Sequence, residues 1–108
     1  MERTASILQH YEEMAVLSGE MLEVARQGRW NELVELDLKR ASVLSGLRAE
    51  VANDAIPDAI AARVSALIQA MLAADAETSA LATSWHGELQ ELIVSLGTER
   101  KLFQAYGP

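Results

Sequence analysis

A glycine between two helical patterns limits how this chain can fold. Residues 25–33 (ARQGRWNEL) end one amphipathic pattern and begin another. Gly28 follows the last apolar residue of the first pattern, where a helix often ends in a left-handed residue that only glycine adopts without strain. Asn31 and Glu32 then place polar and acidic groups near a helix start, where they are favourable. The corner predicts a helical hairpin.

Helical periodicity extends over nearly the whole chain. Residues 4–27 carry an apolar stripe at four-three spacing, and residues 30–52 are apolar over an even wider arc that needs apolar neighbours on two sides. A third and longest pattern covers residues 58–96, entered at Asp54 or Ile56 beside a proline that the first turn of a helix tolerates. Gly97 and Thr98 predict a stop and a capped restart, with a short helix through residue 105.

These patterns and the composition predict an all-α fold. The chain has 108 residues, of which 50% are apolar and only 5% aromatic, a balance that suits packed helices better than strands. We expect one domain over residues 1–108: an antiparallel bundle of three main helices, the third one long, plus a short C-terminal helix. Residues 98–108 would be a short docking or regulatory tail, because so short a helix must dock or fray.

Charge and motifs exclude several function classes. Nine basic and sixteen acidic residues give a net charge of −7, which argues against a nucleic-acid surface. There is no cysteine, no apolar run near the ~20 residues that cross a bilayer, and no signal-peptide core, so a cytoplasmic protein without membrane insertion is expected. His10 and His86 lack metal-ligand spacing, and no phosphate loop or nucleophile elbow occurs. We expect no catalytic residue, metal site or cofactor.

The helical patterns carry more apolar face than three helices of unequal length can hide. Such a surplus usually forms a groove for a partner, a dimer seam or both. We expect the groove to be lined by residues at the edges of the stripes: Leu38, Ile68, Leu72 and Ile93.

Three stretches resemble the FliT-type flagellar export chaperones: residues 23–33, the run LQELI at 89–93 and the ending QAYG at 104–107. The resemblance implies a small chaperone that binds the C-terminal region of the filament-cap protein in an apolar helix groove and prevents its premature assembly. It also implies delivery to the export ATPase and export gate of the flagellar type III apparatus. Leu102 and Phe103 match the face of a last helix that can cover the groove, and Tyr106 matches a tyrosine used at the gate.

Two other readings stay open at this point. The surplus apolar faces could make a constitutive homodimer or hetero-bundle, with the chain acting as a non-catalytic adaptor. A helical-bundle enzyme ranks a distant third, because periodicity places the carboxylates outside the bundle interior.

Overall fold

The fold is wholly helical in the part of the chain that the structure describes. A computed structural model gives the backbone of residues 2–51 and 56–106 and the side chains of residues 3–51 and 56–91, and no strand occurs in these ranges. Residues 1–78 form one unit and residues 79–108 a second, and each is described by itself. The predicted all-α class is confirmed.

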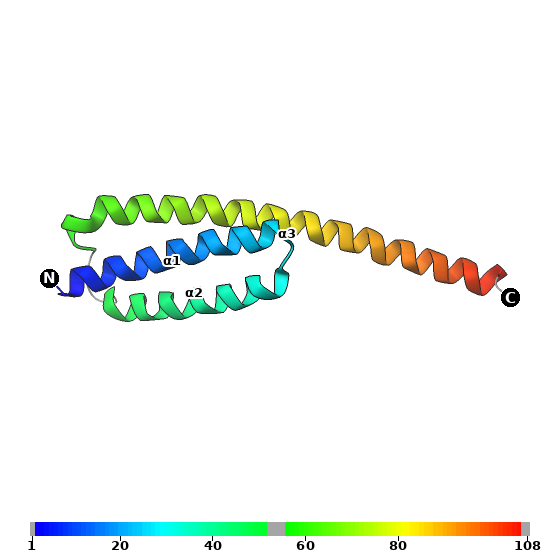
Figure 1. The fold of residues 1–108 in the computed structure, drawn as a ribbon, viewed down its shortest axis with the longest axis horizontal. Helices are drawn as coiled ribbons and strands as arrows, with labels where there is room; N and C mark the ends of the chain where they lie inside the picture. Colours follow the sequence, from blue (N-terminus) through cyan, green and yellow to red (C-terminus); the bar gives the residue numbers. More distant parts are fainter. Residues whose placement is uncertain (1, 52–55, 107–108) are drawn as a thin grey trace. The chain divides into compact units, whose positions relative to one another are not determined.

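Three helices follow one another along the chain: α1 (Glu2–Arg26), α2 (Trp30–Val51) and α3 (Asp58–Tyr106). Their bounds agree with the predicted patterns to within two residues, except at the end of α3. Within residues 1–78, α1 lies between α2 and the first part of α3, and α2 runs antiparallel to both (Figure 1).

The corner between α1 and α2 has the geometry that its glycine predicts. Gly28 takes a φ of 71°, in the left-handed region. Its amide donates to the carbonyl of Ala25 (3.1 Å), and the amide of Arg29 donates to the carbonyl of Val24 (2.8 Å). These two bonds satisfy carbonyls that the end of α1 would otherwise leave unpaired, in the pattern of a Schellman motif. The Arg29 side chain then pairs with Glu32 in the first turn of α2.

The second corner leads into α3 at the predicted place. Asp54 lies outside the described residues, whereas Ile56 and Pro57 precede the first helical residue, Asp58. The carbonyl of Pro57 accepts a bond from the amide of Ile60 at 3.1 Å. Proline suits this position because the amide proton that it lacks would have no partner at a helix start.

The predicted stop at Gly97 and restart at Thr98 is wrong for the backbone. α3 continues without a break to Tyr106, so the short C-terminal helix is the last part of α3 and not a separate element. A single glycine inside a helix costs only about 1 kcal/mol relative to alanine. That cost is smaller than the loss of several successive backbone hydrogen bonds, so glycine and a potential cap do not by themselves end a helix.

Buried side chains from all three helices form one core within residues 1–78. Ile7 of α1 is completely buried and packs with Leu47 of α2 and with Ile60 and Val64 of α3. The predicted stripe of α1 accounts for its side of this core. The remaining buried apolar residues of the described chain extend along α1 and α3: Met21, Val24, Ala25, Leu67 and Met71.

α2 buries far less of its apolar arc than its sequence predicts. Leu47 is its only buried residue, and Val34 and Leu38 are 61% and 67% exposed. Within the described part of the chain, the side of α2 that carries Val34 and Leu38 therefore has no apolar neighbour to bury it. An apolar strip of α2 remains accessible to a partner.

A polar cluster fixes the start of α1 against the end of α2. The Ser6 hydroxyl donates to a Glu50 carboxylate oxygen at 2.5 Å, and Arg3 donates to the Glu50 carbonyl at 3.0 Å. His10 lies 3.3 Å from the other carboxylate oxygen of Glu50, which has no hydrogen-bond partner by geometry. A Cβ placed on Gly46 would come within 3.2 Å of the His10 ring, so this glycine gives the imidazole room between the helices.

The first part of α3 is more apolar than its residue pattern predicts. Asp58–Glu91 contains an 18-residue window that could cross a membrane by length and composition alone, which corrects the expectation that no such run exists. Alanines raise the average hydropathy there without forming an unbroken apolar string. A core helix of a soluble protein passes the same test, and Ile60, Val64 and Leu67 are buried in the helical core, so the window is weak support for a span.

Candidate functional site

A groove runs between α2 and α3 within residues 1–78, with α1 beneath it. Its volume is about 420 Å³. We call it the α2/α3 groove. Its floor comes from α1 and its two walls from α2 and α3. The residues that line it are Tyr11, Met14, Asp37, Arg40, Ala41, Leu44, Leu47, Ile68, Met71, Leu72 and Asp75.

Two of the four predicted groove residues line this groove. Ile68 and Leu72 form its α3 wall, and their side chains are 37% and 64% exposed. Leu38 does not line the groove but lies on α2 three residues before Ala41, which does, and this places it at the outer edge. Ile93 lies outside the residues whose side chains the structure describes, as do Leu102, Phe103 and Tyr106.

The floor of the groove and one residue of its edge were not among the four predicted groove residues. Tyr11 and Met14 of the α1 stripe are half-buried, pack against the core and also line the groove. Val34 lies one turn before Leu38 on α2 and is equally exposed. One feature of the sequence could have indicated the groove floor. Ala41 is the smallest side chain on the α2 wall, and a short side chain there leaves space above α1.

Arg40 ties three helices together at one end of the α2/α3 groove. Its guanidinium donates to the Ser18 hydroxyl of α1 at 2.8 Å and to the Asp75 carboxylate of α3 at 2.6 Å. Asp37, one turn earlier on α2, lies 3.3 Å from the same guanidinium. Ser18 is completely buried in the middle of the α1 stripe, so Arg40 provides the hydrogen bond that a buried hydroxyl needs.

The arrangement suits binding of an amphipathic helix. An open trough with apolar walls and floor accepts side chains spaced three or four residues apart on one face of a partner helix. Asp37 is 63% exposed and Asp75 38% exposed, so the end of the trough also offers carboxylate oxygens to polar or basic groups. Among the residues that the structure describes, no group of three or more His, Asp or Glu is arranged to hold a metal ion.

A larger hollow in residues 1–78 lies elsewhere. It measures about 590 Å³ and opens between α1 and α2, where it shares no lining residue with the α2/α3 groove. Two carboxylates, Glu12 and Glu13, line it, and the sequence predicted no site there. The α2/α3 groove remains the better candidate for an apolar partner because its α3 wall contains two large exposed apolar side chains, Ile68 and Leu72, whereas the hollow between α1 and α2 has one, Val16.

A comparison with protein families agrees with the resemblance that the sequence carries. The family model described as flagellar protein FliT matches residues 8–108, nearly the whole chain. No curated protein and no solved structure matches this chain. The resemblance seen in residues 23–33, 89–93 and 104–107 is confirmed by the family match. FliT proteins are flagellar export chaperones and are not known as enzymes. A helical bundle with an open apolar groove is consistent with that membership, and this chain belongs to the FliT family.

Proposed function

We propose that this protein is a cytoplasmic chaperone that binds the C-terminal region of the flagellar filament-cap protein in the α2/α3 groove. Binding there prevents premature assembly of the cap protein and precedes its delivery to the export ATPase and export gate of the flagellar type III apparatus. The observation that supports the proposal most directly is the exposed wall of Ile68 and Leu72 above a half-buried apolar floor.

The exposed side chains can supply the affinity that such a chaperone needs. Leu72 is 64% exposed and Leu38 67% exposed, so a docked helix would remove most of each side chain from water. Complete burial of a leucine contributes about 1.5–3 kcal/mol. A few such contacts, reduced by the entropy cost of association, are consistent with micromolar binding.

The groove also gives the bound helix a direction. Arg40 already bridges Ser18 and Asp75, which leaves the exposed Asp37 carboxylate with only a 3.3 Å ion pair. A cationic residue on the bound helix would be favoured at this end of the groove, since opposite charges attract most strongly at short range. We therefore expect a lysine or arginine of the cap-protein helix to lie beside Asp37.

The end of the chain is part of the same proposal. Residues 98–108 would act as a docking or regulatory tail: with α3 opened before residue 98, Leu102 and Phe103 would cover the groove, and Tyr106 would engage the export gate. Ile93 would extend the groove lining. Family resemblance supports these roles, and the residue types are suitable: two large apolar side chains and one tyrosine in a short stretch.

The test is calorimetric titration of the protein with a peptide from the C-terminal region of the filament-cap protein. Leu72→Asp should weaken binding by more than about 100-fold, because it removes a leucine that the bound helix would bury and sets a carboxylate against the apolar face of that helix. Ala66→Asp is the matched control: Ala66 is exposed on the same helix but does not line the groove. It should change the affinity less than about twofold, and circular dichroism should show that both variants remain helical.

A version that ends at Leu96 tests the tail. Stronger binding by this version would support a covering role for residues 98–108. No binding by the full chain or the shortened one, or equal losses in Leu72→Asp and Ala66→Asp, would contradict the groove proposal.

The exposed apolar strip of α2 also favours a second candidate function, a non-catalytic adaptor that forms a constitutive homodimer or hetero-bundle. Val34 and Leu38 are exposed on α2 and could pair with the same residues of a second copy. Light scattering across a concentration series separates the two functions. A dimer that persists on dilution and is lost in Leu38→Asp would favour the adaptor, whereas a monomer that binds the cap peptide would favour the chaperone.

A further inference from the structure

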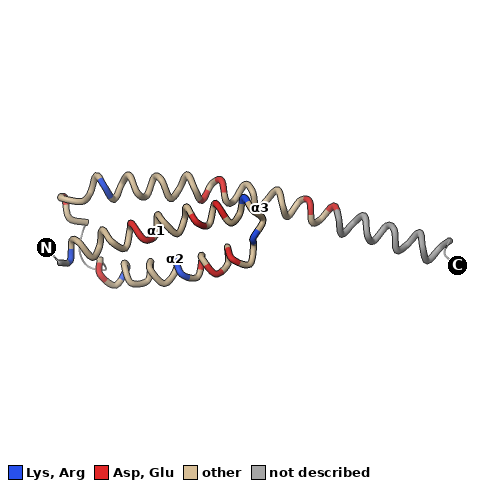
Figure 2. The backbone as a smooth tube through the Cα atoms, viewed as in Figure 1, with Lys and Arg blue, Asp and Glu red and all other residues tan. Residues whose placement is uncertain are grey.

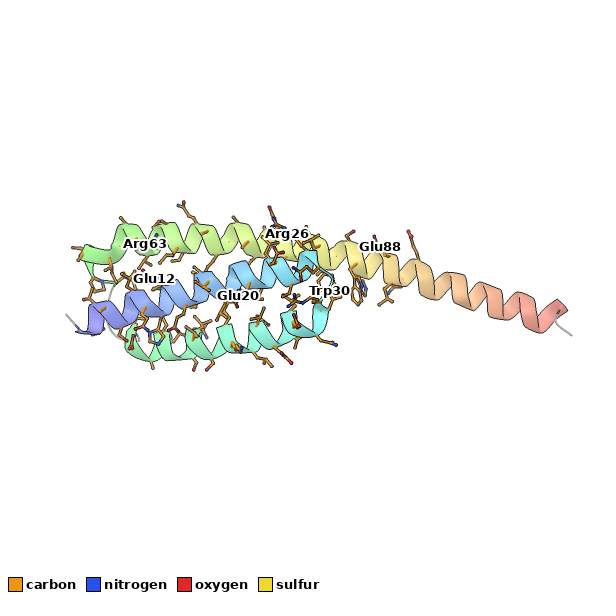
Figure 3. All side chains as sticks on the ribbon, in the orientation of Figure 1. Glu12, Glu20, Arg26, Trp30, Arg63 and Glu88 are labelled. Carbon is orange, nitrogen blue, oxygen red and sulfur yellow. The ribbon has the colours of Figure 1, made fainter. Side chains whose placement is uncertain are left out.

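A second groove lies along the seam of α1 and α2. Two hollows follow each other there, of about 590 and 380 Å³, and Lys39 lines both. None of their lining residues belongs to the α2/α3 groove. Figure 3 shows two of the carboxylates that line this seam, Glu12 and Glu20, along α1. We call the two hollows together the acidic groove.

The bottom of the acidic groove is apolar. Val16 is 60% exposed in the larger hollow, beside Leu17 and Val43, which are half-buried. Val24 and Leu36 continue the apolar strip in the smaller hollow. An exposed valine between half-buried apolar neighbours gives a partner helix something to bury, so the groove is not merely a solvated charged surface.

Carboxylates dominate the edges of the acidic groove. Among the residues that line the two hollows there are six glutamates against one lysine and one arginine, a net charge of −4. Figure 2 shows acidic positions along α1 and in the first half of α2. The glutamates concerned are Glu12, Glu13, Glu20, Glu23, Glu32 and Glu35.

Only some of this charge is neutralised within the fold. Arg29 pairs with Glu32, and Arg63 of α3 lies 3.9 Å from Glu12. Glu13, Glu20 and Glu35 have no cation within ion-pair distance in the part of the chain that the structure describes. Clustered carboxylates of one sign repel one another and attract a cationic partner, with an attraction that salt screens.

We propose that the acidic groove is a second docking surface, which binds an amphipathic helix of a partner protein with an apolar face and a lysine- or arginine-rich edge. Residues 9–24 of α1 span the two hollows, a length of about 22 Å and therefore about four turns of a partner helix. A second copy of this chain fits poorly, because two molecules that each carry a net charge of −7 would bring the same carboxylates together.

This surface is separate from the α2/α3 groove and does not depend on the function proposed for it. Since the two grooves share no lining residue, both can be occupied at once. A chaperone of this shape could hold an apolar client on one face and a basic partner on the other. Complementary charge would mainly accelerate association with that partner and select against acidic ones.

The probe for this proposal is a synthetic peptide of about 14 residues, held helical by an internal lactam, with leucines on one face and lysines along the edges. A peptide with every lysine replaced by glutamate is its control. Binding to the full chain is measured by fluorescence anisotropy at about 20 mM and about 300 mM salt. We expect the lysine peptide to bind and to weaken strongly at the higher salt, and the glutamate peptide not to bind.

Matched variants separate the groove from charge in general. Glu13→Lys with Glu20→Lys reverses two carboxylates of the groove, and Glu88→Lys with Glu91→Lys makes the same net change at exposed positions of α3 outside it. The first pair should weaken binding about tenfold and the second less than twofold. Val16→Ser leaves the charge unchanged and should weaken binding about fivefold, because it removes the exposed apolar contact.

Several results would overturn the proposal. Equal losses in the two double variants would mean attraction to the whole acidic protein. No effect of Val16→Ser would mean that the apolar floor takes no part. A dimer detected by light scattering that Val16→Ser dissociates would assign the surface to a second copy. Because none of these variants alters the α2/α3 groove, binding of the cap peptide to that groove reports independently on the function proposed above.

Discussion

The hydrogen bond between Arg40 and Ser18 predicts that the effect of Ser18→Ala on stability depends on whether Arg40 is present. Ser18 is completely buried, and its hydroxyl accepts a 2.8 Å bond from the Arg40 guanidinium, whose side chain is 21% exposed. A hydrogen bond to a charged group contributes about 1.5–3 kcal/mol in such a setting, and a buried polar group that loses its partner costs about 1–3 kcal/mol. The cost of losing this serine should therefore depend on whether the arginine is present.

In the natural sequence, Ser18→Ala should lower the free energy of unfolding by about 1 kcal/mol, because it removes the bond but leaves Arg40 paired with Asp75. Arg40→Met keeps most of the aliphatic stem and should cost about 2–3 kcal/mol, because it leaves a buried hydroxyl unpaired. In the Arg40→Met background, Ser18→Ala should then be neutral or stabilising. The expected coupling energy is about 1–2 kcal/mol.

Urea denaturation followed by circular dichroism at the helix band measures all four proteins of this cycle. The ion pair between Arg26 and Glu77 is the control, since its atoms are equally close at 2.8 Å but both side chains are more than half exposed, at 54% and 59%. Its coupling in Arg26→Met and Glu77→Gln should be under about 0.5 kcal/mol. Equal effects of Ser18→Ala in both backgrounds, within about 0.3 kcal/mol, would refute the assignment of Arg40 as the partner that permits a buried serine.

Two further predictions concern the backbone and the core. Gly28→Ala should destabilise the protein by about 1 kcal/mol, because a φ of 71° strains any side chain. Gly19→Ala should stabilise it by about 0.5–1 kcal/mol, because Gly19 is helical with open space around it. Melting temperatures that shift in the same direction for both variants would contradict these predictions. Ile7→Ala should lower the free energy of unfolding by about 3–4 kcal/mol, since Ile7 is completely buried. Val34→Ala should lower it by under about 1 kcal/mol, since Val34 is 61% exposed. Similar urea midpoints for the two variants would show that the core does not centre on Ile7.

The amino-acid sequence by itself determined the elements and most of their ends. Helical periodicity placed α1, α2 and the start of α3, and Gly28 and Pro57 marked the two corners, because the left-handed conformation and the missing amide proton are properties of single residues. The same local reasoning failed at Gly97. Whether a glycine ends a helix depends on what competes for the backbone around it, and α3 continues to Tyr106.

The sequence also indicated that apolar surface would be left over, and it placed Ile68 and Leu72 at the edge of the stripe. Tertiary structure decided which part of this apolar surface stays exposed. Met14 packs against the core and also forms the floor of the groove because α2 and α3 do not close over α1, and Arg40 connects the helices because it reaches α1 and α3 at once. The acidic groove was hidden for the same reason: Glu13 and Glu35 lie far apart in the chain, and only the packing of α1 against α2 lines one groove with both. Periodicity reports which face of a helix is apolar, but the distance between two faces is set by how side chains from different helices fit together.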